Sequence, residues 1–147
     1  MELSISEVSK KMNLTIPTLR YYDNLGLLPN LKKNKAGNRI FTDEDIEVIR
    51  IIGYLKKSGM QLNEIKEFIG WCKQGDATLE KRLNLFKKRK EKILQQIDEL
   101  QETLSLIEFK EWYYTKAVKD GTEKIVKKMP IQEMPIKVQE EFKNCHC

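Results

Sequence analysis

The sequence predicts a mainly α-helical protein in which several short helices and one small β-hairpin precede a single long helix. The 147 residues include only 7 Gly and 4 Pro, which argues against an all-β fold. Apolar residues recur at helical spacing along most of the chain. Residues 79–120 contain neither Gly nor Pro, which favours one uninterrupted helix. A charged fraction of 33% is normal for a protein with a long helix.

The first two helices are short and follow each other closely. Ser4 and Glu7 have the spacing of a capping box, which predicts a helix that begins at Ile5. Thr15 is the expected N-cap of a second helix that ends near Leu25, just before Gly26. Two short helices joined by a break of about four residues form a helix-turn-helix.

A basic β-hairpin is expected directly after these helices. Residues 34–37 carry turn chemistry, and short extended pieces flank them. The segment from Lys32 to Phe41, called the wing below, contains four basic residues and no acidic residue. The order of elements therefore predicts a winged helix-turn-helix.

Two more helices complete this part of the chain. Thr42 and the acids that follow it predict the N-terminus of a third helix. A fourth helix is expected from about Leu62 to Lys73. The expected core residues of the two helices are Ile46, Ile49, Ile52 and Leu55 in the third and Ile65, Phe68, Ile69 and Cys72 in the fourth.

The long helix carries the strongest periodic pattern in the chain. From Leu79 to Ile107 apolar residues alternate in steps of four and three, with Lys90 as the exception, which is typical of a coiled coil. At 1.5 Å per residue the helix would be roughly 60 Å long. Its apolar stripe needs a second long helix, so we expect a homodimer. The expected dimer seam consists of Leu83, Phe86, Ile93, Ile97, Leu100, Leu104 and Ile107.

Three regions follow from this pattern. We expect a DNA-binding domain at residues 1–75, a dimerisation helix at residues 76–121 that ends at Gly121, and a tail at residues 122–147. The two prolines of the tail predict an irregular segment with one short helix near residues 138–142.

The segment from Thr18 to Pro29, TLRYYDNLGLLP, resembles the signature of MerR-type transcriptional regulators. The later segments GNRIFT, LKKSGM and NEIK fit the same family in the expected order. The resemblance implies an antiparallel dimer on promoter DNA that bends and untwists an overlong promoter spacer for RNA polymerase. The sequence departs from the family pattern at Asn38, where an aromatic residue is usual.

Candidate DNA contacts lie on the second helix and the wing. A helix in the major groove contacts bases through its N-terminal residues, while cations and hydroxyls bind phosphates. One tyrosine of the pair is expected to pack inward; the alternatives are that both tyrosines belong to the core and that the wing is merely a solvated basic face. The candidates are Thr15, Thr18, Arg20, Tyr21, Tyr22, Lys32, Lys33 and Arg39, with Lys56 added by the family resemblance.

Two further clusters each have two interpretations. The basic block from Lys81 to Lys92 either adds to the attraction for DNA or forms the solvated face of the coiled coil. Cys145, His146 and Cys147 carry soft ligands for zinc, copper or nickel. Adjacent residues on a tail rarely preorganise a metal site, so we expect neither a metal nor another cofactor.

The sequence favours a regulator over two other classes of protein. An enzyme lacks support because the chain has no Gly-rich phosphate loop and its single histidine is His146. A coiled-coil adaptor would explain the long helix but not the wing. The N-terminus lacks the layout of a signal peptide and no membrane span is expected, so we predict a cytoplasmic protein.

Overall fold

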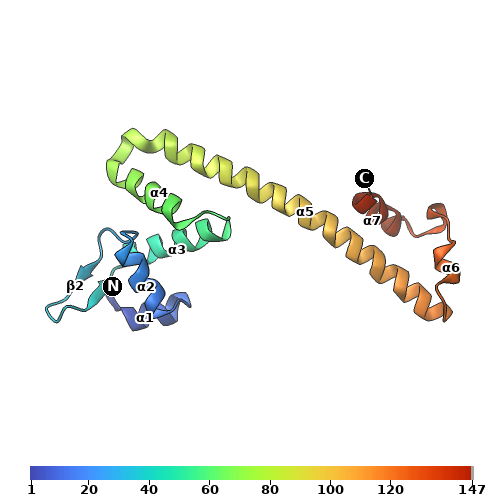
Figure 1. Cartoon of the computed structure of the whole chain (residues 1–147), viewed down its shortest axis with the longest axis horizontal. Helices are drawn as coiled ribbons and strands as arrows, with labels where there is room; N and C mark the ends of the chain where they lie inside the picture. The colour runs from blue at the N-terminus through green and yellow to red at the C-terminus, as the bar shows by residue number, and fades with distance from the viewer. Residues whose placement is uncertain (147) are drawn as a thin grey trace. The chain divides into compact units, whose positions relative to one another are not determined.

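The computed structural model describes residues 1–146 and consists mainly of helices (Figure 1). The chain divides into two compact units, of which the first covers Met1–Arg89 and the second begins at Lys90. No helix among the described residues has the length and apolar character needed to cross a membrane.

The helix-turn-helix consists of α1 (Ile5–Met12) and α2 (Ile16–Asn24). The predicted capping box is present: the Ser4 N–H donates to Glu7 Oε2 at 2.7 Å, and the Glu7 N–H donates to Ser4 Oγ at 3.3 Å. The hydrogen bonds from Ser4 lower the pKa of Glu7. Asn13 ends α1 in the left-handed region, with φ of 53°, and turns the chain towards α2.

The wing forms a hairpin from β2 (Lys32–Lys33) and β3 (Arg39–Phe41), as predicted. The Asn34 side chain accepts from the backbone N–H groups of Ala36 and Asn38, which closes the turn. A third strand, β1 (Leu3–Ser4), pairs antiparallel with β3 and was not predicted. The sheet order is therefore β1-β3-β2.

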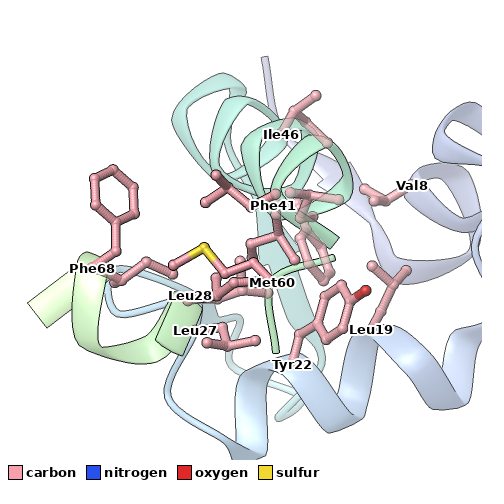
Figure 2. Close-up of a cluster of buried hydrophobic side chains, with 14 residues drawn as sticks. Val8, Leu19, Tyr22, Leu27, Leu28, Phe41, Ile46, Met60 and Phe68 are labelled. Carbon is pink, nitrogen blue, oxygen red and sulfur yellow. The ribbon is translucent and has the colours of Figure 1, made fainter. Parts of the chain in front are cut away.

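The first unit is completed by α3 (Asp43–Lys57) and α4 (Leu62–Gln74). Figure 2 shows the core, in which Tyr22 and Leu19 of α2 face Phe41 of the wing. The predicted core residues of α3 and α4 are buried, with one exception. Cys72 is exposed, so its assignment to the core was wrong. It lies near the end of α4, one turn beyond Phe68 and Ile69 on the same face, where it lines an open hollow with them and stays in contact with solvent.

The long helix α5 runs over Leu79–Asp120 after a short 3₁₀ turn, η1 (Gly75–Thr78). Gly75, which has φ of 80°, ends α4, whereas the first compact unit continues to Arg89. Gly121, with φ of 72°, ends α5 as expected.

The segment after Gly121 is more ordered than the sequence predicts. It contains α6 (Lys124–Lys127), the 3₁₀ turn η2 (Ile131–Glu133) and α7 (Ile136–His146). Met134 and Val138 pack with Phe109 of α5 in a second apolar cluster, to which Trp112 and Phe142 also belong. The short helix predicted near residues 138–142 is confirmed as part of α7. The helix α6 and the apolar cluster were not predicted, because these dispersed apolar residues bury one another only in the folded unit.

Candidate nucleic-acid interface

The N-terminus of α2 presents two exposed or half-exposed hydroxyl groups. Thr15 is the N-cap, and its Oγ1 accepts from the Thr18 N–H at 3.3 Å. The two hydroxyl oxygens lie 2.7 Å apart and hydrogen-bond with each other. A helix N-terminus with small hydroxyl side chains can approach a base edge or a phosphate closely.

The next residues of α2 separate into an exposed face and a buried face. Arg20 is exposed, and Tyr21 is 52% exposed. Tyr22 is 2% exposed and belongs to the core. The prediction that one tyrosine packs inward is confirmed for Tyr22, and the alternative that both belong to the core is wrong.

Tyr22 also contacts one of the predicted cations. Lys56, near the end of α3, donates from Nζ to the Tyr22 hydroxyl at 3.3 Å and lies 5.6 Å from the centre of its ring. Both contacts hold the ammonium group against α2. Tyr22 therefore positions a cation at the edge of the helix-turn-helix rather than presenting its own ring.

The wing cations differ in their surroundings. Lys32 and Lys33 are exposed on the edge strand β2. Arg39 is half-buried on β3, and its Nε donates to Asp23 Oδ2 at 2.7 Å. Asp23 was not predicted as a functional residue, because a contact between residues sixteen positions apart has no local sequence pattern.

One open hollow brings the second helix, the wing and the start of the chain together. Its volume is about 510 Å³. Arg20 lines it from α2, Asn38 and Arg39 line it from the wing, and residues 2–6 line it from β1 and α1. We call it the wing hollow. Its charged groups include two guanidinium groups and the carboxylate of Glu2.

The basic block from Lys81 to Lys92 contains two hydrogen-bonded arginines and five exposed lysines. The Arg82 and Arg89 side chains of the basic block donate to the backbone oxygens of Gly75 and Ser58, at 2.9 and 3.5 Å. These two arginines therefore tie the start of α5 to the C-terminal ends of α4 and α3. The five lysines of the block are exposed.

Of the three possible metal ligands at the end of the chain, the structure describes the side chain of Cys145 alone. Cys145 is half-buried, and its Sγ donates to the Phe142 oxygen at 3.4 Å. The His146 side chain and Cys147 lie outside the described residues. Among the residues that the structure does describe, no three His, Cys, Asp or Glu side chains cluster as metal ligands would.

The predicted seam residues lie along α5 with little cover in one chain. Leu100 is 68% exposed, the largest exposed fraction among them, and Ile93 is half-buried. The exposed members are Leu83, Phe86, Ile97, Leu100, Leu104 and Ile107. An apolar row of this length exposed to water is unusual for a monomer and marks an interaction surface.

Comparisons with known proteins agree with this architecture. Residues 3–70 match the model of the MerR HTH family regulatory proteins. An uncharacterized HTH-type transcriptional regulator of Haemophilus influenzae is 38% identical over 133 residues, which cover 90% of this chain and 98% of the relative. The protein YyaN of Bacillus subtilis, another HTH-type transcriptional regulator, is 32% identical over 82% of this chain and 96% of its own length.

Solved structures show the same likeness. HiNmlR, a MerR family regulator that lacks the sensor domain and was crystallised bound to promoter DNA, superposes with a TM-score of 0.81 at 38% identity. That match covers 88% of this chain and 98% of HiNmlR. A MerR family regulator of Listeria monocytogenes gives a TM-score of 0.74 at 30% identity. The winged helix-turn-helix, the long helix and these relatives together show that this chain belongs to the MerR family of helix-turn-helix transcriptional regulators.

Proposed function

We propose that the chain is a dimeric, sequence-specific DNA-binding protein that remodels promoter DNA in response to an effector. The observation that carries the proposal is the wing hollow, where Arg20 of α2 and Arg39 of the wing meet on one surface. The relative HiNmlR, a MerR family regulator that lacks the sensor domain, was crystallised on promoter DNA.

The surface of the first unit suits a duplex. The N-terminus of α2 offers Thr15, Thr18 and Arg20 to the major groove, where arginine distinguishes guanine from the other bases. Tyr21, Lys32 and Lys33 are exposed beside it and would contact phosphates. These phosphate contacts would set the position of α2 on the duplex, and the base contacts would give sequence specificity.

The partner of the exposed seam would be a second copy of the chain in antiparallel orientation. The basic block, Lys81 to Lys92, contains seven cations and one acid. Residues 98–111 of the same helix contain five carboxylates and one lysine. An antiparallel pair brings each basic half beside the acidic half of its partner, whereas a parallel pair would face like charges. This arrangement favours the coiled-coil interpretation of the basic block over a contact with DNA.

A dimer with two such units would bind two half-sites. Bending the DNA between the half-sites costs about 1–6 kcal/mol, which contacts on both sites can offset. By family resemblance the bend aligns two promoter elements for RNA polymerase, and an effector shifts the dimer between two arrangements. The proposal places the protein in the cytoplasm, where promoter DNA and RNA polymerase are found.

The direct test is binding of the whole chain to the DNA upstream of its own gene. We expect tighter binding to this DNA than to a scrambled duplex of the same composition, and weaker binding at 200 mM than at 50 mM salt. Equal affinity for both duplexes would contradict sequence-specific binding. No binding to either duplex would favour the coiled-coil adaptor.

A further inference from the structure

The contact between Asp23 and Arg39 joins the recognition helix to the wing. Arg39 Nε lies 2.7 Å from Asp23 Oδ2, and the side chains are only 20% and 24% exposed. Asp23 lies in the last turn of α2, and Arg39 begins β3, opposite Lys33 of β2. The ion pair therefore connects the element that would enter the major groove with the element that would bind phosphates.

The geometry uses only one side of the guanidinium group. Arginine has five N–H groups in a planar fork, and Asp23 accepts from the single N–H on Nε. Among the described residues, no hydrogen bond is recorded for the two terminal nitrogens. Arg39 also lines the wing hollow, the open surface that it shares with Arg20. A carboxylate on Nε thus leaves the terminal nitrogens available to an anion.

The charge of Asp23 makes this placement informative. An isolated carboxylate on a DNA-binding surface repels phosphates and lowers affinity. From Lys32 to Phe41 the wing contains no acid, yet Asp23 lies at its base. Its presence there is explained if it reduces the conformational freedom of Arg39, since an arginine side chain that is already ordered loses less entropy when it binds a phosphate.

We propose that Asp23 is a positioning residue for DNA binding, which holds the Arg39 guanidinium so that its terminal nitrogens contact a backbone phosphate. The inference rests on the proposed DNA-binding function and assigns Arg39 a definite partner on each side. The carboxylate makes no contact with DNA itself. Its effect on affinity passes through Arg39.

The test compares Asp23→Asn, Asp23→Glu and the control Glu67→Gln in the full chain. Glu67 is an exposed acid of α4 that does not line the wing hollow, so its substitution removes the same charge without touching the ion pair. Affinity for the DNA upstream of the gene is measured by fluorescence anisotropy from 50 to 300 mM salt. Circular dichroism melts confirm that each variant is folded at the assay temperature.

We expect Asp23→Asn to weaken DNA binding about fivefold to tenfold. The slope of log affinity against log salt concentration should become shallower by the equivalent of about one phosphate contact. Asp23→Glu should restore most of the affinity. Glu67→Gln should leave affinity unchanged, since Glu67 lies outside the wing hollow. If Asp23→Asn only lowered stability, its folded molecules would bind DNA with the same salt dependence as the wild type.

The proposal is overturned if Asp23→Asn binds as tightly as, or more tightly than, the wild type. It is also overturned if Arg39→Gln keeps the full salt dependence, and this result does not require Asp23→Asn to fold. The double variant Asp23→Asn, Arg39→Gln should lose no more DNA affinity than Arg39→Gln alone, because both substitutions remove the same phosphate contact. Failure of the wild type to prefer its own upstream DNA would instead refute the proposed function.

Discussion

At the N-terminus of α2, the chain presents side chains of different reach. Thr15 and Thr18 are short and hydrogen-bonded to each other, while Arg20 extends from an exposed position one turn below the cap. Only the arginine can form two parallel hydrogen bonds to one base. Arg20 is therefore the residue for which a substitution should most change the recognition of sequence.

We expect Arg20→Ala to weaken binding to the upstream DNA by about 1–3 kcal/mol, the usual value for a good base contact. The dimer should remain intact, because Arg20 lies far from α5 in sequence and belongs to the first unit. Gel-shift titration and sedimentation measure the two properties. The matched control is Lys143→Ala, which removes one exposed cation from α7. Wild-type affinity of Arg20→Ala would refute the assignment of α2 as recognition helix.

In the second unit, Glu141 is a buried carboxyl group next to other carboxylates. Burial raises its pKa, and the hydrogen bond with Glu108 and the charges of Glu108 and Glu111 raise it further. Lys137 acts in the opposite direction at 4.0 Å. The folded state therefore binds the Glu141 proton more tightly than the unfolded state does.

This pKa shift has a defined sign for stability. Glu141 contributes most to the free energy of unfolding below its ordinary pKa of 4.5. This contribution falls as the pH rises through the raised pKa of the folded state. Glu141→Gln keeps a polar group without the charge, so we expect a higher melting temperature than the wild type at pH 7 and the same one at pH 4. The control variant is Glu140→Gln, which makes the same substitution at the exposed neighbouring residue. A lower melting temperature of Glu141→Gln at pH 7 would contradict this account.

At the scale of elements, the caps hold the short helices in register. Thr42 and Asp45 form a reciprocal capping box at the N-terminus of α3: the Thr42 N–H and hydroxyl both donate to Asp45 Oδ2, at 2.8 and 2.9 Å. Asp45 is 3% exposed, so its carboxylate depends on these donors. The box also fixes the end of the wing, because Phe41 directly precedes it.

We expect Thr42→Ala to lower the free energy of unfolding by about 1–2 kcal/mol, at the upper end of the range for N-caps, because a buried carboxylate loses a donor. Urea titration at one fixed protein concentration measures the loss. Ser4→Ala removes the equivalent hydroxyl from the exposed cap of α1 and should cost less. Equal losses for the two variants would show that burial of Asp45 does not matter.

Cys145, His146 and Cys147 carry the soft ligands, and we expect this end of the chain not to be the effector site. Removing residues 144–147 should leave DNA binding and induction nearly unchanged, since Phe109, Met134 and Val138 hold the second unit together without them. A reporter strain tests this with zinc, copper and nickel added singly. Loss of induction after truncation, together with stoichiometric metal binding by the intact protein, would assign these residues as ligands.

Local chemistry made most of the first unit predictable. The caps at Ser4, Thr15 and Thr42 and the turn after Asn34 depend on neighbouring residues, and each was confirmed. Strand β1 was missed because two residues carry no periodicity. The order of the segment after Gly121 was missed because it depends on contacts with α5. The Asp23–Arg39 ion pair joins two elements and is visible only in the fold.

At the scale of the whole molecule, the proposed function depends on two copies of the chain. A single unit of this size contacts one half-site, and a two-fold dimer contacts two half-sites whose spacing the dimer geometry sets. The seam residues of α5 would then contribute to DNA binding through dimerisation, without touching DNA themselves. Dimerisation and affinity for the full operator should be lost together.

Replacing Ile97 and Leu104 together with Lys should therefore give monomers at micromolar concentration. Both side chains are about half exposed in the single chain, so the change should leave each unit folded while it places four like charges in the dimer seam. Sedimentation measures the mass, and a gel shift should show the operator affinity falling with it. The control pair is Ile125→Lys with Ile136→Lys, which changes exposed apolar residues of α6 and α7 outside the seam. A dimeric Ile97→Lys, Leu104→Lys protein would refute the seam, whereas a monomer with full operator affinity would refute the need for two copies.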